Sequence, residues 1–150
     1  MINTFREEYF FLSNKYYAPV MYKGLMFENN EAAFQSGKCI YDSYRINFCH
    51  LTPFEAKNLG HLISLRRDWK RIMDQVMEDC VRDKFIRNED LRKRLLETGN
   101  EELVEGNMWH DNYYGNCYCD KCKNKIGKNT LGKILMKIRE ELKNCQNHVK

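Results

Sequence analysis

Apolar positions in the first third of the chain form short clusters that are separated by turn residues. The clusters at residues 19–22 and 25–28 flank Lys23-Gly24, a pair that suits a tight hairpin turn. We therefore expect a small β element near the N-terminus.

Further along the chain, apolar positions recur every three or four residues, which is the period of an amphipathic helix. One such helix should begin with a capping box of Thr52 and Glu55, with Pro53 at its first position. Three more are predicted to begin after Asp68, after Asn88 and at Thr130. The apolar stripe of the helix after Asp68 consists of Ile72, Met73, Val76, Met77, Cys80 and Phe85. The predicted fold is mainly α (α+β), a multihelical single domain over residues 1–150 with a small N-terminal β element.

One predicted helix, Glu31–Tyr41, is unusual because it is nearly free of charge. Its apolar arc consists of Ala33, Phe34, Gly37, Ile40 and Tyr41. Its only charged side chains are Glu31 and Lys38, which share with Gln35 a strip about 60° wide on a helical wheel. A helix this poor in charge is typical of a buried position, where charges must be paired or used. The strip is therefore either a solvated face or the wall of a pocket.

The segment LVEGNMWHDNYYG, residues 103–115, is the second candidate for chemistry. In an extended chain, side chains alternate between two faces, and one face would hold Glu105, Asn107, Trp109 and Asp111. Two carboxylates, an amide and an indole suit a flat polar ligand that needs proton transfer and stacking. The alternative is an exposed edge strand, or a loop in which the alternation is accidental.

The junction before the helix at Asp68 has a structural and a functional interpretation. Asp68 can cap the helix and Trp69 can anchor it in the core. Arg66 or Arg67 could instead bind a phosphate at the helix N-terminus. We favour the structural interpretation unless the other candidate segments converge on this junction.

Charge is unevenly distributed, although the net charge is only +4. Residues 121–150 hold nine Lys and Arg against two Glu. Such a segment is either a solvated terminal helix or a surface that attracts phosphate or nucleic acid. The sequence has no signal-peptide pattern and no apolar run long enough to span a membrane, so we expect a cytoplasmic protein with no membrane partner.

Three of the seven cysteines crowd into CYCDKC, residues 117–122. A zinc site would need a fourth ligand, and the candidates are His110, Asp120, Cys145 and His148. The other interpretation, which we favour, is reduced thiols in a loop with no metal. The segment KNKIGKNT is not a P-loop, because Cys122 replaces its first Gly and Asn129 its Ser or Thr.

Six segments together resemble the NADAR/YbiA family of N-glycosidases over about residues 9–142. They are FLSN, NEAAFQSGK, EAKNLG with RRDW, KF followed by LLETG, LVEGNMWHDNYYG, and GKNTLGKILMKIR. The resemblance implies hydrolysis of a ribosyl C–N bond. It implies one of two substrate classes: ADP-ribose attached to a nucleobase, guanine in particular, or a ribosylated intermediate of riboflavin synthesis. The implied pocket consists of Asn14, Glu31, Gln35, Lys38, Trp69, Glu105, Asn107, Trp109 and Asp111.

The resemblance also suggests roles for these residues. Glu31 and Asp111 would be the catalytic carboxylates, and Lys38 could form a Schiff base with the opened ribose. Arg66 would contact a phosphate. The family's aromatic pair usually ends in Trp-Gly, but here it is Tyr113-Tyr114-Gly115, so Tyr114 presents a smaller ring with a hydroxyl. No cofactor is needed.

Two further interpretations concern partners. The substrate class makes nucleic acid a candidate partner beside the ribosyl small molecule itself. A rival from another class is a non-catalytic module that binds ADP-ribose or nucleic acid. Release of ADP-ribose from an ADP-ribosylated base would distinguish an enzyme from such a module.

Overall fold

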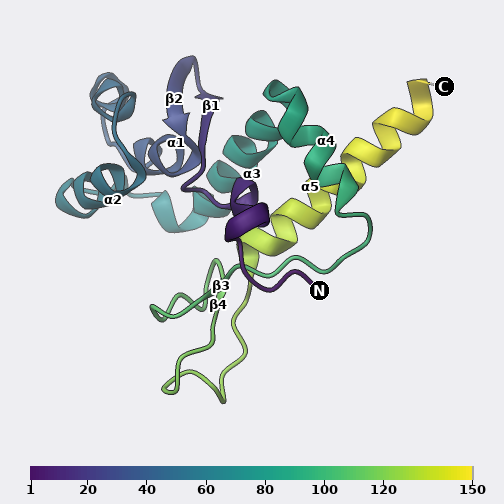
Figure 1. The fold of residues 1–150 in the computed structure, drawn as a ribbon. Coiled ribbons are helices and arrows are strands. Elements are labelled where there is room, and N and C mark those ends of the chain that lie inside the picture. Colours follow the sequence, from purple (N-terminus) through teal and green to yellow (C-terminus); the bar gives the residue numbers. More distant parts are fainter. Residues whose placement is uncertain (150) are drawn as a thin grey trace. The chain divides into compact units, whose positions relative to one another are not determined.

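The computed structural model describes residues 1–149, with side chains as far as residue 146. Helices dominate it, and the strands form small two-stranded sheets (Figure 1). The α-helices are α1 (Asn30–Ser36), α2 (Pro53–Leu62), α3 (Trp69–Arg87), α4 (Glu89–Glu97) and α5 (Thr130–Val149). The strands are β1 (Tyr17–Tyr22), β2 (Leu25–Asn29), β3 (Gly106–Asn107) and β4 (Asn116–Cys117). The predicted fold class, mainly α with a small N-terminal β element, is confirmed.

The chain divides into two compact units. One consists of Asn14–Leu91 and is called here the hairpin unit. The other, the terminal unit, combines Met1–Ser13 with the chain from Arg92 onward. A single domain over residues 1–150 stays a prediction.

In the hairpin unit, β1 and β2 pair as an antiparallel hairpin, as predicted. Lys23 and Gly24 have φ angles of 45° and 83°, and two left-handed residues in sequence are the signature of a type I′ turn. Alternate residues of β1, namely Ala18, Val20 and Tyr22, are buried. The hairpin thereby packs on α3 and α1.

Helix α1 begins as predicted but ends early. The Asn29 side chain caps it by accepting a hydrogen bond of 2.8 Å from the backbone N–H of Ala32. The predicted end at Tyr41 is wrong, because the helix stops at Ser36 and the next three N–H groups donate to carbonyls three residues back. Ile40 and Tyr41 are 54% and 74% exposed, so they do not belong to its apolar arc.

The second and third helices begin where the capping residues predict. Thr52 and Glu55 form the complete capping box of α2. Asp68 occupies the N-cap position of α3, but its carboxylate binds Arg66 instead of capping the helix. Of the predicted stripe of α3, Val76, Met77, Cys80 and Phe85 are buried, whereas Ile72 and Met73 are half-buried.

In the terminal unit, the chain start and α5 are both tied to the segment around Leu103. Ile2 forms a parallel bridge with Leu103. The buried Arg139 of α5 donates hydrogen bonds of 2.8 Å to the Thr98 hydroxyl and to the Glu101 carbonyl. None of the helices within residues 1–149 is long and apolar enough to cross a membrane.

The extended conformation predicted for residues 103–115 is wrong for most of that segment. Only Gly106–Asn107 form a strand, and it pairs in parallel with Asn116–Cys117. The chain between them is a loop of bends, with His110 in a left-handed conformation at φ 69°. The alternation of Glu105, Asn107, Trp109 and Asp111 therefore does not place them on one face of a strand.

Candidate active site

The start of α1 is fixed by two asparagines of the hairpin unit. The Asn14 side-chain oxygen accepts a hydrogen bond of 2.7 Å from the Asn30 amide, and the Asn14 backbone carbonyl accepts one of 3.1 Å from the N–H of Glu31. Asn30 is fully buried and also contacts the Met77 sulfur. Asn14 therefore positions the backbone of Glu31.

One turn later, Gln35 holds the Glu31 carboxylate. Its side-chain amide donates a hydrogen bond of 3.1 Å to Glu31 Oε1. Gln35 is buried against α2 at Gly60, where an added Cβ would lie 1.9 Å from Gln35 Oε1. Only glycine at position 60 leaves room for this arrangement. The Gln35 side chain is thus held between the carboxylate on one side and the α2 backbone on the other.

Lys38 lies in the turn that follows α1, and its backbone is held from both sides. Its N–H donates to the Gln35 carbonyl at 3.1 Å, and its carbonyl accepts from the N–H of Arg66 at 3.0 Å. The helix has ended, but the Gln35 bond keeps Lys38 one tight turn from Gln35. The backbone of Lys38 therefore stays next to Gln35 although the helix is shorter than expected, and a shared pocket for Glu31, Gln35 and Lys38 stays a prediction.

Burial favours the neutral forms of both Glu31 and Lys38. Burial raises the pKa of Glu31, although the hydrogen bond from Gln35 and the charges of Lys57, Lys38 and Lys15 oppose this. Burial lowers the pKa of Lys38, and the charge of Lys57 adds to this effect, while the charge of Glu31 opposes it. A carboxyl group that protonates more readily and an amine that deprotonates more readily are suited to proton transfer and nucleophilic attack.

The junction at Arg66–Trp69 contacts α1 and the turn that follows it. The Arg66 guanidinium binds Asp68 through two hydrogen bonds of 2.6 and 3.1 Å. The Trp69 ring is buried, and its centroid lies 5.2 Å from that of Phe34 in α1. Packing therefore accounts for Trp69, and contact of either residue with a ligand stays a prediction.

The remaining candidates lie in the terminal unit, where Asn107 organises the loop. Its side-chain amide donates to the Asp111 carbonyl at 2.8 Å and to the Glu105 carbonyl at 3.5 Å. Its side-chain oxygen accepts from the N–H groups of Trp109 and Asp111 at 3.2 and 3.1 Å. Asn107 is buried. Its hydrogen bonds go to the loop itself, so it positions the loop's other candidates.

Asp111 shapes the next turn with one of its carboxylate oxygens. Oδ1 accepts hydrogen bonds of 3.0 and 2.9 Å from the N–H groups of Tyr113 and Tyr114. The two tyrosine rings meet edge to face, with centroids 4.8 Å apart. Trp109 is 44% exposed. The Glu105 carboxylate lies where a Cβ on Gly115 would be, since Glu105 Oε2 is 2.2 Å from that position.

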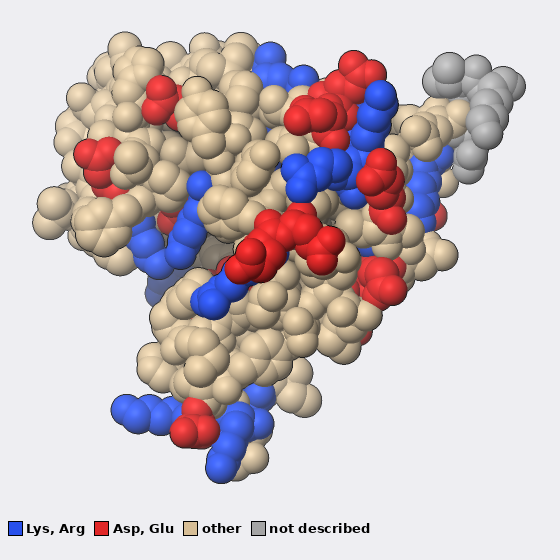
Figure 2. All heavy atoms as spheres, viewed as in Figure 1, with Lys and Arg blue, Asp and Glu red and all other residues tan. Residues whose placement is uncertain are grey.

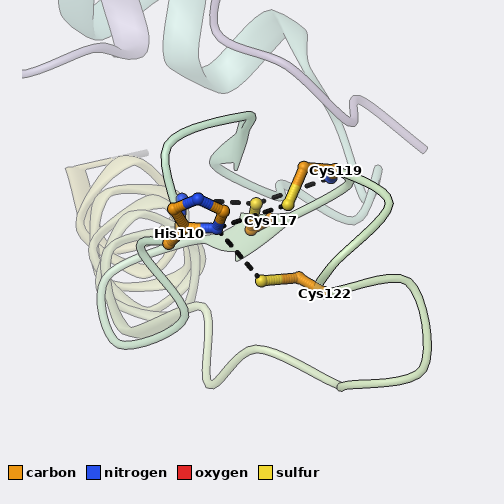
Figure 3. A group of neighbouring side chains, drawn as sticks. All are labelled: His110, Cys117, Cys119 and Cys122. Atoms are coloured by element: carbon orange, nitrogen blue, oxygen red, sulfur yellow. Dashed lines mark hydrogen bonds between the residues drawn. The ribbon is translucent and has the colours of Figure 1, made fainter.

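Two features outside the predicted set carry titratable groups. Lys84 of α3 is buried, and its Nζ lies 5.8 Å from the ring centroid of Tyr16 and 5.1 Å from that of Phe85. Burial lowers its pKa to about 7. In the terminal unit, His110 and three cysteines of the CYCDKC segment form the group of residues that could hold a metal (Figure 3).

Sequence carried a signal for each of these features. Lys84 lies four residues after Cys80 on the apolar stripe of α3, a spacing that predicts a position facing the core. His110 was one of four candidate fourth ligands. Of the others, Cys145 is exposed in α5 and Asp120 is outside the group, and the side chain of His148 lies outside the described residues.

The sequence of this chain matches a known protein family. The model of the NADAR domain matches residues 2–143. An N-glycosidase from Nostoc punctiforme is 45% identical over an alignment that spans 62% of this chain and 57% of that protein. The N-glycosidase YbiA of Escherichia coli K12 is 34% identical over 83% of this chain and 76% of YbiA.

Two more comparisons concern the fold and a relative with a different name. The solution structure of E. coli YbiA has a TM-score of 0.80 at 30% identity and covers 97% of this chain and 89% of that one. A riboflavin biosynthesis protein of Vibrio vulnificus is 32% identical over 91% of this chain, but the alignment spans only 36% of that protein. This chain belongs to the NADAR domain family: its sequence matches the family model over nearly its whole length, and its fold matches that of YbiA.

Proposed function

We propose that this protein is an N-glycosidase that hydrolyses the C–N bond between ribose and a base, and that its substrate is ADP-ribose attached to guanine. The name N-glycosidase, shared by the relatives from N. punctiforme and E. coli, supports the reaction class. The observation that carries the proposal is the pair Glu31 and Lys38, which interact electrostatically and whose pKa values are displaced toward each other. The guanine-linked substrate follows from the sequence resemblance.

Breaking a ribosyl C–N bond needs a proton for the departing base and a group that stabilises or attacks C1 of the sugar. We assign the proton to Glu31, because burial raises the pKa of its carboxyl group and so favours the protonated acid. We assign the attack to the Lys38 amine, whose lowered pKa increases its neutral, nucleophilic fraction. Opening of the sugar ring then gives a Schiff base, which water hydrolyses to regenerate the lysine.

The second candidate substrate is a ribosylated intermediate of riboflavin synthesis. It is favoured by one observation, the name of the V. vulnificus relative. The same Glu31 and Lys38 chemistry applies to both substrates, since each presents a ribosyl C–N bond. The choice between them depends on what binds beside the ribose.

A paired assay separates the two substrates from the non-catalytic alternative. The protein is incubated with ADP-ribosylated guanosine and, in parallel, with the riboflavin intermediates, and products are identified by mass spectrometry. We expect free ADP-ribose from the first substrate. Cleavage of only the riboflavin intermediate would replace our substrate assignment, and binding without any cleavage would contradict the enzyme assignment.

Replacing the nucleophile tests the role of Lys38. We expect Lys38→Ala to lose turnover by roughly 10²- to 10⁴-fold, because the attacking amine is gone, with an unchanged far-UV circular dichroism spectrum. Borohydride reduction during turnover should leave a sugar adduct on Lys38 of the unmutated protein. The matched control is Lys70→Ala, which removes an exposed lysine of α3. Full activity in Lys38→Ala would exclude attack by this residue.

A further inference from the structure

Four side chains of the terminal unit converge on one point, and nothing in the proposed reaction uses them. His110, Cys117, Cys119 and Cys122 each offer one ligand atom, and these four atoms lie within 4.8 Å of one another (Figure 3). We propose that they bind a structural Zn²⁺ ion. This inference is independent of the proposed glycosidase activity.

The separations between ligand atoms fit a tetrahedral zinc ion. Zinc–sulfur and zinc–nitrogen distances of about 2.3 and 2.0–2.1 Å place sulfur and nitrogen ligands about 3.6 Å apart in a tetrahedron. Nδ1 of His110 lies 3.3 Å from the Cys119 sulfur and 3.5 Å from the Cys122 sulfur. Both separations are close to the tetrahedral value, so the nitrogen and each of these sulfurs are spaced as two ligands of one ion would be.

Hydrogen bonding among the four side chains explains the cluster less well than a metal does. Nδ1 of a histidine carries either one proton or one lone pair, so it can satisfy only one of its two sulfur neighbours. All cysteines of the chain have free thiols in the structure. A cation at the centre gives the nitrogen and the sulfurs one common partner.

The surroundings of Cys117 have the form that a thiolate ligand needs. Its sulfur accepts the backbone N–H groups of His110 at 3.3 Å and of Cys119 at 3.5 Å. Cys117 and Cys122 are 1% and 4% exposed. Donors around a ligand atom fix its orientation and stabilise its negative charge, and burial keeps water away from these two sulfurs.

Regular secondary structure contributes little to the segment between β3 and α5. Between β3 and α5 the chain has only the two residues of β4 in regular structure, and Ile126 is 97% exposed. Long irregular segments inside a compact unit are uncommon, and coordination of one ion by four side chains would hold this one in place. His110 is, in addition, held at φ 69°, a left-handed conformation that is unfavourable for a non-glycine residue and that metal coordination would stabilise.

The ligand positions suggest what the ion does. His110 stands between Trp109 and Asp111 in the sequence, and Cys117 lies in β4, which pairs with β3 at Asn107. Coordination therefore joins the middle of the Trp109–Asp111 segment, through His110, to β4 and to the turn after it. The zinc ion would fix the conformation of that segment without touching a substrate.

Elemental analysis of the purified full-length protein tests the site directly. With expression in zinc-supplemented medium and purification under reducing conditions, we expect one Zn²⁺ per chain. Cys119→Ser and Cys122→Ser should lose it, whereas Cys145→Ser, which removes an exposed thiol of α5 outside the cluster, should keep it. Replacement by Co²⁺ should give the visible absorption of a tetrahedral thiolate complex.

A second measurement on the unmutated protein avoids variants that fail to fold. Alkylation followed by peptide mass mapping should modify Cys145 with or without metal, but should modify Cys119 and Cys122 only after chelation. Zinc that is absent, or that the Cys122→Ser variant retains, would overturn the proposal. So would a Cys119–Cys122 disulfide in the reduced preparation, or iron in place of zinc.

Discussion

At the scale of single residues, the hairpin unit places a carboxyl group and an amine where each is drawn toward its neutral form. The Gln35 amide opposes this at Glu31, because its hydrogen bond to Oε1 stabilises the carboxylate. Glu31 is thus poised between burial, which raises its pKa, and Gln35, which lowers it. This balance can be tested by removing the amide alone.

We expect Gln35→Met to raise the pKa of Glu31 further, because the hydrogen bond that lowers it is lost. The limb of the pH profile of kcat/KM that Glu31 governs should therefore move to higher pH. The matched control is Gln75→Met, which removes an exposed amide bonded to Asp79 on α3 and should leave the profile unchanged. A profile in Gln35→Met identical to that of the unmutated protein would exclude Glu31 as the titrating group.

Lys84 should make the free energy of unfolding depend on pH. Its pKa falls from 10.5 to about 7 on burial, so between these values the unfolded chain binds a proton that the folded protein does not. The free energy of unfolding should therefore rise with pH from about 7 to 10.5, by up to about 1.4 kcal/mol per pH unit. Urea unfolding across this window measures the slope.

Lys84→Met should abolish that slope, because the buried group no longer titrates. Lys70→Met, an exposed position on the same helix, should keep it. Equal slopes in all three proteins would show that Lys84 does not contribute to the dependence.

Single residues stand out in the sequence where their chemistry conflicts with their surroundings. Glu31 and Lys38 stood out because the predicted helix had no other charge, and the structure keeps them near Gln35. Trp69 could not be assigned in advance, since an indole serves equally as core or as a stacking surface. Here it packs on Phe34.

At the scale of elements, the loop from Asn107 to Tyr114 depends on side-chain hydrogen bonds in place of a sheet. The Asn107 side chain donates and accepts hydrogen bonds with the backbone of residues 109–111. The Asp111 carboxylate accepts hydrogen bonds from the next turn. The alternating pattern predicted a strand because it resembled the period of two. Side-chain capping of this kind competes with sheet formation, and it is not visible in periodicity.

Removing the amide of Asn107 should therefore loosen the loop. We expect Asn107→Ala to destabilise the protein by about 1–3 kcal/mol, since buried partners lose their hydrogen bonds. The backbone amides of Trp109 and Asp111, which donate to the Asn107 side chain, should exchange faster with deuterium. Asn124→Ala, an exposed position in the same part of the terminal unit, serves as the control, and equal exchange in the two variants would contradict the role of Asn107.

At the scale of the whole molecule, the sequence predicted the helical class, the capping box of α2 and the position at which α3 begins. Those features depend on local signals such as Thr52, Glu55 and Lys23-Gly24. The early end of α1 depends on tertiary contacts, including the bond from Arg66 to the Lys38 carbonyl, which no local pattern contains. The convergence of His110 on three cysteines is likewise a product of the folded loop.

The uneven charge of the chain also acts at this scale. Arg139 and Lys143 of α5 donate to carbonyls of residues 99–101, so part of the basic excess is structural. Lys121, Lys123 and Lys125 are exposed, and at the far end of the loop between β4 and α5 Figure 2 shows basic side chains around one acidic group. These three lysines are available to a phosphate backbone.

If the substrate base is part of a nucleic acid, these lysines should matter for that substrate alone. We expect Lys121→Gln, Lys123→Gln and Lys125→Gln together to raise KM for ADP-ribosylated DNA and to reduce the dependence of log affinity on log salt by up to about 0.9 per lost phosphate contact. Cleavage of ADP-ribosylated guanosine should not change. Equal effects on both substrates would indicate damage to the protein in place of lost DNA contacts, and Lys70→Gln controls for charge.

The fit of Gln35 against Gly60 has a consequence for the evolution of the family. A side chain at position 60 would collide with the Gln35 amide, although residue 60 itself carries no chemistry. The two positions are therefore coupled: a relative that replaces the glycine must also shorten or redirect the residue equivalent to Gln35. We expect these positions, 25 residues apart in this sequence, to change together across NADAR domains and to mark subfamilies that hold the carboxylate differently.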